Sequence, residues 1–148
     1  MEKLLKKNLE YTVNLIQENG LKLTKQRKAI LEAFLISKEH LSAEDIFLQA
    51  KKKYPNINLA TVYRTLSWLK KYGFAHAHYF LPNKAFFEPA LIKTQHHDHL
   101  ICTKCGLIIE FFNQKIEDEQ EKIAKKYNFF ITNHKMELYG LCKNCITH

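Results

Sequence analysis

The sequence predicts an α+β fold in which an N-terminal winged helix-turn-helix domain precedes a smaller α/β domain. The first half has four helix patterns with capping signals, and two short strand patterns around a Pro-Asn turn follow them. The second half alternates strand patterns with a single helix pattern. We place the domain boundary so that the two domains span residues 1–89 and 90–148.

Apolar residues recur at helical spacing in four segments of the first half. Each segment after the first begins with a side chain that can cap a helix: Thr24, the capping box Ser42-Ala-Glu-Asp45, and Asn58. The third helix should end near Tyr54-Pro55, because the residue before a proline disfavours the helical conformation. Gly73 should end the fourth helix.

The fourth helix pattern has one apolar and one mixed face. The apolar stripe consists of Leu59, Val62, Leu66 and Leu69. The other face carries small, hydroxyl, aromatic and basic side chains: Ala60, Thr61, Tyr63, Arg64, Ser67 and Lys71. Such groups near a helix start are what a recognition helix offers to a DNA groove. The alternative is a small helical bundle with an ordinary solvated face.

Two strand patterns follow the fourth helix, from Phe74 to Phe80 and from Ala85 to Phe87. They flank Pro82-Asn83, so we expect an antiparallel ribbon, the wing of a winged helix. His76 and His78 fall on one face of this ribbon, and we interpret them as surface residues.

The net charge of +8 lies almost entirely in the first half of the chain. Residues 1–88 carry 15 Lys and Arg against 8 Asp and Glu, a net charge of +7, and the remainder carries 8 against 7. A basic half suggests a polyanionic partner, although the charge could serve solubility alone. The sequence contains no apolar run of the ~20 residues that span a membrane and no secretory signal pattern, so we expect a cytoplasmic protein.

The most informative stretch runs from Gln95 to Cys105 and holds three histidines and an aspartate. If it is extended, side chains alternate between the two faces. His97 and His99 then share one face, and His96 and Asp98 share the other. Neighbours on one face are about 6.6–6.8 Å apart, close enough to bind one ion. The stretch therefore predicts two separate sites for metal ions.

All four cysteines lie beyond residue 100, in the pairs Cys102-x-x-Cys105 and Cys142-x-x-Cys145. Two such pairs predict a tetrahedral zinc site whose four positions are all filled by thiolates, which makes it structural. A pair of redox motifs is the alternative. Around these pairs we expect a strand over 108–112, a helix over 114–127, and one or two strands within 129–142. The inward face of the helix should contain Ile116, Ile123 and Ala124.

Several stretches match one known family, in order, along nearly the whole chain. The most specific is His96-His-Asp-His-Leu-Ile-Cys-Thr-Lys-Cys-Gly106. The others are Leu21-Lys-Leu-Thr24, Ser42-Ala-Glu-Asp45, Leu59-Ala-Thr-Val-Tyr-Arg-Thr-Leu66, Thr132-Asn-His134 and Leu138-Tyr-Gly-Leu-Cys142. On these residues the sequence resembles the ferric uptake regulator family of metal-dependent bacterial repressors. The resemblance implies that the C-terminal α/β domain is a dimerisation domain.

The resemblance also implies roles for individual residues. The regulatory metal site would contain His40, Glu88, His97 and His99. An additional metal site would contain His96, Asp98, Glu117 and His134. DNA contacts would come from Tyr63 and Arg64 on the recognition helix and from Lys22 in the minor groove.

By resemblance, the protein is a repressor that binds double-stranded palindromic operator DNA as a homodimer, or as a tetramer, when the regulatory site is filled. Peroxide sensors of the family typically have aspartate at the positions of Glu88 and Glu117, so glutamate at both favours the iron-sensing branch. The zinc-sensing branch commonly places a cysteine among its sensing ligands, whereas the structural site here uses every cysteine. Fe(II) is therefore the expected regulatory metal, although Mn(II), Zn(II) or Co(II) suit the same ligands.

Two alternatives lie outside transcription. A metallohydrolase with a dinuclear His/Asp centre would need an open coordination position beside a substrate pocket, and the sequence offers no candidate nucleophile. A zinc-ribbon RNA-binding module would need exposed aromatic residues for base stacking. We expect a DNA-binding protein without enzymatic activity.

Overall fold

The computed structural model of the protein describes residues 2–36, 40–91 and 96–146. The chain folds into two compact units, Met1–Thr94 and Gln95–His148. Among the helices of the described ranges, none combines the length and apolar character that a membrane crossing requires.

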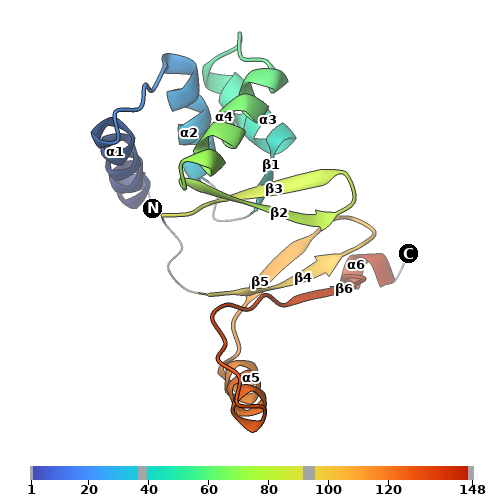
Figure 1. Ribbon diagram of the computed structural model, residues 1–148. Coiled ribbons are helices and arrows are strands. Elements are labelled where there is room, and N and C mark those ends of the chain that lie inside the picture. Colours follow the sequence, from blue (N-terminus) through green and yellow to red (C-terminus); the bar gives the residue numbers. More distant parts are fainter. Residues whose placement is uncertain (1, 37–39, 92–95, 147–148) are drawn as a thin grey trace. The chain divides into compact units, whose positions relative to one another are not determined.

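The first unit has four helices and a small antiparallel sheet with the strand order β1-β3-β2 (Figure 1). Its elements are α1 (Glu2–Glu18), α2 (Lys25–Ile36), β1 (Leu41–Ser42), α3 (Ala43–Lys53), α4 (Leu59–Lys71), β2 (Ala75–Leu81) and β3 (Lys84–Pro89). This is the predicted winged helix: helices followed by the β2–β3 ribbon, whose turn contains Asn83 at a φ of 59°.

The helix starts predicted from capping residues are confirmed. The Thr24 hydroxyl accepts the Arg27 amide hydrogen at 3.2 Å. At α3, Ser42 and Asp45 form the reciprocal capping box. The Asn58 side chain accepts the Thr61 amide hydrogen at 2.8 Å, which fixes the start of α4. Each cap satisfies an amide that would otherwise have no partner within the helix.

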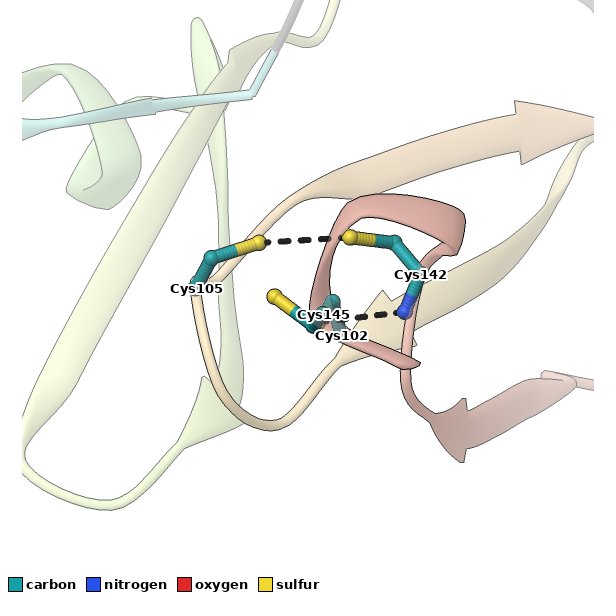
Figure 2. Close-up of side chains that lie close together, drawn as sticks. All are labelled: Cys102, Cys105, Cys142 and Cys145. Atoms are coloured by element: carbon teal, nitrogen blue, oxygen red, sulfur yellow. Dashed lines mark hydrogen bonds between the residues drawn. The ribbon is translucent and has the colours of Figure 1, made fainter. Parts of the chain in front are cut away.

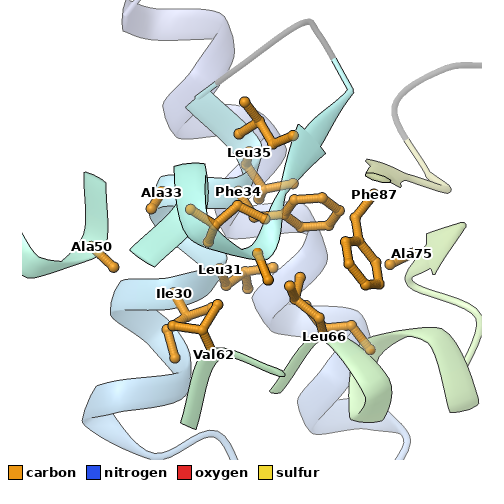
Figure 3. Packing of buried hydrophobic residues seen from close by; sticks show 14 of the residues in the cluster. Ile30, Leu31, Ala33, Phe34, Leu35, Ala50, Val62, Leu66, Ala75 and Phe87 are labelled. Atoms are coloured by element: carbon orange, nitrogen blue, oxygen red, sulfur yellow. The ribbon is translucent and has the colours of Figure 1, made fainter. Parts of the chain in front are cut away.

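The core of the first unit is an apolar cluster shared by the helices and the wing (Figure 3). Ile30 and Phe34 of α2 pack with Leu66 of α4, and Phe87 of β3 joins them from the sheet. Fully burying side chains of this size contributes roughly 1.5–3 kcal/mol each. Because this face of α4 is buried, the opposite face, with Tyr63, is exposed.

Strand β1 was not predicted, because two residues are too short to give a sequence pattern. It pairs antiparallel with β3, and Leu41 lies opposite Phe87. His40 precedes Leu41 and Glu88 follows Phe87, so this register places His40 opposite Glu88. A two-residue strand therefore positions two of the candidate metal ligands.

The second unit contains a three-stranded sheet with the order β5-β4-β6. Its elements are β4 (Asp98–Cys102), β5 (Ile108–Phe111), α5 (Gln114–Lys126), β6 (Glu137–Gly140) and α6 (Lys143–Ile146). β5 is antiparallel to the central strand β4, and β6 is parallel to it.

Several boundaries in the second unit differ from the prediction. The central strand begins only at Asp98, so His96 and His97 precede it, and Gln95 lies outside the described residues. The segment 129–142 contains one strand, within the predicted one or two, but this strand covers only Glu137–Gly140. The short α6 was not predicted, since four residues are too few to show a helical period.

The predicted burial of Ile123 in α5 is wrong, because this side chain is 58% exposed. Figure 1 shows α5 lying away from the β5-β4-β6 sheet, so the sheet does not cover this helix face. The sheet is also incompletely covered, and Leu100, Ile109 and Leu138 are all exposed. The second unit thus leaves much of its apolar surface open.

Candidate metal centres and nucleic-acid interface

The four cysteines come together in the second unit. Cys102 ends β4, and the parallel pairing of β4 with β6 places Gly140 opposite it, so the following Cys142 lies beside the first pair. The four sulfurs all lie within 4.8 Å of one another. Figure 2 shows Cys105 and Cys142 facing each other, with their sulfurs 3.7 Å apart. Thiolates bound about 2.3 Å from a tetrahedral zinc ion lie about 3.8 Å apart, so the cluster fits zinc.

Hydrogen bonds prepare one of these thiols for ionisation. The backbone amides of Cys105 and Cys142 lower the pKa of Cys102 to about 6. Burial and the neighbouring thiols instead raise the pKa of Cys145 to about 12, because thiolates so close together repel one another. A divalent cation offsets this repulsion, and metal ligation requires the thiolate form. The cluster therefore favours a bound cation over four free thiols.

A second cluster contains His96, Asp98, Glu117 and His134, whose donor atoms lie within 4.8 Å of one another. His96 Nε2 is 3.0 Å from Asp98 Oδ1, and His134 Nε2 is 3.2 Å from Glu117 Oε2. Asp98 is fully buried, and a buried carboxylate is costly unless it is paired or bound to a cation. The structure thus brings together the four residues that the family resemblance implies for an additional site.

The rings of His97 and His99 lie together, with centroids 4.9 Å apart. Strand alternation predicted this pairing. His99 lies opposite Glu110 of β5 and Glu137 of β6, so the sheet flanks it with two carboxylates. Neither glutamate was among the predicted ligands, although Glu110 is the one charged residue in the apolar strand Ile108–Phe111.

In the first unit, His40 and Glu88 lie together and are buried. His40 Nε2 is 3.4 Å from Glu88 Oε2, and His78 Nε2 is 2.9 Å from Glu88 Oε1. The interpretation of His78 as a surface residue is wrong: its side chain is only 16% exposed. Its neighbour His76 is exposed, as predicted. The sequence does not single out His78, because its contact with Glu88 runs diagonally across the β2–β3 pairing, in which Glu88 lies opposite His76.

Polar contacts order the exposed face of α4. The Tyr63 hydroxyl donates to Glu44 of α3 at 2.7 Å, which lowers the pKa of the Glu44 carboxyl and raises that of Tyr63. Arg64 Nη2 donates to Thr61 Oγ1 at 3.2 Å. These contacts hold two of the predicted DNA-contacting side chains on the side of α4 that faces away from the core.

The loop that carries Lys22 is anchored by Arg27. The Arg27 guanidinium donates to the Lys22 carbonyl oxygen at 2.9 Å and lies 4.5 Å above the ring of Trp68 in α4. The loop before α2 and helix α4 are therefore linked through one side chain. This link leaves the Lys22 side chain available for another contact, because only its backbone carbonyl is used.

A winged helix with an ordered, exposed α4 face, followed by clusters of metal ligands, defines a metal-dependent, DNA-binding transcription regulator. The sequence model of the ferric uptake regulator family matches residues 18–139. The chain belongs to the ferric uptake regulator family, which confirms the resemblance noted from the sequence.

Relatives and solved structures agree with this assignment. The ferric uptake regulation protein of Neisseria meningitidis is 40% identical over 131 residues, which cover 88% of this chain and 90% of that protein. The ferric uptake regulator of Helicobacter pylori, described with three functional metal binding sites, has a TM-score of 0.83 and 36% identity over 96% of this chain and 93% of that chain. The regulator of Francisella tularensis, solved with iron, has a TM-score of 0.76 and 32% identity over 86% and 96% of the two chains.

Proposed function

We propose that the protein is an Fe(II)-sensing repressor that binds palindromic operator DNA as a homodimer when its regulatory metal site is filled. The observation that carries this proposal is the division of candidate ligands between the two units. His40 and Glu88 belong to the winged-helix unit, and His97 and His99 belong to the second unit. Two ligands from one unit make an incomplete site, so an ion bound by all four links the units.

The spacing within the first pair supports a shared ion. Two ligand atoms bound about 2.1 Å from one ion lie about 3.0–3.4 Å apart, depending on whether the site is octahedral or tetrahedral. His40 Nε2 and Glu88 Oε2 are 3.4 Å apart. In the second unit, Glu110 lies across from His99, and we add it to the proposed ligand set. Histidine and carboxylate ligands suit Fe(II) and also accept Mn(II), Zn(II) or Co(II).

Metal control of DNA binding follows from a population shift. The ion binds the arrangement that assembles all of its ligands more tightly than any other, so it increases the population of that arrangement. In a dimer, this arrangement fixes two recognition helices at the spacing of two operator half-sites. Without the ion the winged helices are not held at that spacing, and operator affinity falls.

We propose residues 1–89 as the DNA-binding domain. The exposed face of α4 enters the major groove, where Tyr63 and Arg64 contact base edges. Lys22 reaches the minor groove from its anchored loop. The net charge of +7 over residues 1–88 supports phosphate binding, which adds affinity without sequence choice.

We propose residues 90–148 as the dimerisation domain. One face of its sheet has a hollow lined by apolar side chains, among them Leu100, Ile109 and Leu138. Contiguous exposed apolar surface of this kind marks an interaction site. A second copy of the chain is the proposed occupant, because a two-fold dimer matches a palindromic operator.

We assign zinc to Cys102, Cys105, Cys142 and Cys145 as a structural ion, and a further divalent ion to His96, Asp98, Glu117 and His134. The cytoplasm is the proposed location, since its reducing conditions keep thiols available for metal binding. At the regulatory site, His40, Glu88, His97 and His99 would hold Fe(II). Its positive charge would offset the cost of burying the Glu88 carboxylate.

The test is anaerobic binding to duplex DNA, titrated with Fe(II), Mn(II) and Zn(II) and repeated after exposure to peroxide. A duplex selected by the protein from a random pool provides the probe. We expect Fe(II) to strengthen binding at a lower concentration than Mn(II), in keeping with the general order of divalent-metal affinities, and peroxide to leave the protein unmodified. Binding that ignores all three metals would contradict the proposal. A response to Zn(II) alone would identify a zinc sensor, and oxidation of a ligand histidine would identify a peroxide sensor.

A further inference from the structure

One carboxylate of the first unit lies between two imidazoles. Glu88 of β3 has its Oε2 atom 3.4 Å from His40 Nε2 and its Oε1 atom 2.9 Å from His78 Nε2. The His40 and His78 rings meet edge to face, with centroids 4.9 Å apart. All three side chains are largely buried, with exposed fractions of 1%, 8% and 16% for His40, Glu88 and His78.

The two contacts of Glu88 have different chemistry. A distance of 2.9 Å is the usual length of an N–H···O hydrogen bond, whereas 3.4 Å is longer than usual and fits two ligands of one ion. Among the described residues, no set of candidate ligands whose donor atoms all lie within 4.8 Å of one another includes His78. His78 therefore has the position of a hydrogen-bond donor to a ligand rather than that of a ligand.

The His78 ring is itself held in place. It stacks on the ring of Phe80, with centroids 5.1 Å apart and an angle of 11° between the planes. Phe80 is buried, so the stacking partner is fixed by the packing of the wing. Because the ring plane is set, the direction of Nε2 toward Glu88 is set as well. A carboxylate is acceptor only, so a hydrogen bond here requires the tautomer that carries its hydrogen on Nε2.

We propose that His78 is a positioning residue of the regulatory metal site: it donates a hydrogen bond to Glu88 Oε1 and thereby directs Glu88 Oε2 toward the ion. The inference rests on the proposed role of Glu88 as a ligand. Outer hydrogen-bond partners orient ligands, and losing one typically lowers metal affinity 10–100-fold. His78 would then strengthen metal sensing without touching the metal.

The experiment measures Co(II) affinity and the Co(II) visible spectrum in zinc-loaded, full-length protein that carries His134→Ala to weaken the additional site. His78→Leu removes the donor. His78→Gln keeps a side-chain N–H at similar reach. His76→Leu is the matched control, since His76 lies on the same strand, directly opposite Glu88, but is exposed. Thermal unfolding of each protein without Co(II) is measured in parallel.

We expect His78→Leu to weaken Co(II) binding at least about 10-fold, and His78→Gln to recover most of this loss. The Co(II) spectrum, the unfolding temperature and the His76→Leu control should stay as in the parent protein. Co(II) affinity that His78→Leu leaves unchanged would overturn the proposal. An equal loss of Co(II) affinity in both His78 variants would also overturn it, because His78→Gln keeps a hydrogen-bond donor. A spectrum that shows a lost nitrogen ligand would then identify His78 as a ligand, and a lower unfolding temperature would identify it as a structural residue.

A double-mutant cycle with Glu88→Ala separates this inference from the proposed function. If His78 acts through Glu88, adding His78→Leu to Glu88→Ala should weaken Co(II) binding no further. Additive losses would mean that His78 acts independently of Glu88. That result would contradict the positioning role of His78 and leave the proposed function untouched. If Glu88→Ala itself leaves Co(II) affinity unchanged, Glu88 is no ligand and the proposed regulatory site fails, whatever His78 does.

Discussion

The two units of the chain reach a folded state by different means. The first unit buries a large apolar cluster, in which Ile30, Phe34 and Leu66 are almost completely removed from solvent. In the second unit the apolar residues with comparable burial are Ile101, Cys102 and Ala124, while Phe130 is 84% exposed. Small domains without sufficient core need metals, disulfides or oligomerisation to be stable. The comparison indicates that the second unit depends on its cysteine cluster, and on the partner proposed above, more than the first unit does.

The largest effect should come from breaking the cysteine cluster. We expect Cys102→Ser to remove zinc and unfold the second unit, because zinc binding at such sites is worth on the order of 10 kcal/mol of folding free energy. The α-helical signal of the first unit should persist in circular dichroism. Zinc content measured by mass spectrometry of the native protein provides the check. A zinc content equal to that of the parent protein would contradict the four-cysteine site.

The next effect should fall on the first unit. Leu66 is fully buried in the core, so we expect Leu66→Ala to lower the free energy of unfolding by about 2–5 kcal/mol. Zinc content should be unchanged, because the cluster lies in the other unit. Chemical denaturation followed by fluorescence of Trp68, which lies in α4, measures the loss. A loss below about 1 kcal/mol would mean that the first unit does not depend on this core.

A charged side chain on the exposed sheet face should have a smaller effect on folding but a large effect on assembly. Leu138 is 48% exposed in the single chain, so Leu138→Asp should change the unfolding free energy of the monomer by about 1 kcal/mol or less. The charge should nevertheless dissociate the proposed dimer, which sedimentation velocity measures directly. The matched control is Leu48→Asp, on an exposed position of the first unit, which should leave the dimer intact.

The smallest effect on stability is expected for Arg64→Ala. Arg64 is exposed on α4, so the unfolding free energy should stay within about 0.5 kcal/mol. Binding to a selected duplex should weaken by about 1–3 kcal/mol, the usual value of a specific base contact. Metal affinity should not change. Fluorescence anisotropy with labelled duplex measures the loss, and unaltered binding would remove Arg64 from the proposed contacts.

Local signals in the sequence predicted most of the first unit. Thr24, Ser42 and Asn58 each cap the helix that they were expected to start, and the turn at Asn83 separates the two wing strands. Strand alternation also predicted which histidines of the central stretch lie together, although the strand itself begins only at Asp98. These features depend on neighbours within a few residues, which a single sequence displays.

What the sequence did not display depends on pairing between distant segments. The contact of His78 with Glu88 and the position of Glu110 opposite His99 both depend on strand register. Ile123 is exposed because the sheet does not pack against that face of α5, which the sequence of the helix does not reveal. A helical period locates the apolar face of a helix but does not reveal whether the surface that packs against this face belongs to the same chain. The largest error therefore concerned the unit with the smaller core.

The parallel pairing of β4 with β6 carries a consequence for biosynthesis. The central strand and its Cys102 leave the ribosome well before the strand and the Cys142 that complete them. Until then, the Cys102 thiol lacks the Cys142 amide that helps to lower its pKa, and the strand lacks one of its two neighbours. Newly made chains therefore cannot complete the central sheet until this late strand has emerged, and all four cysteines become available to a zinc ion only once Cys145 has been made.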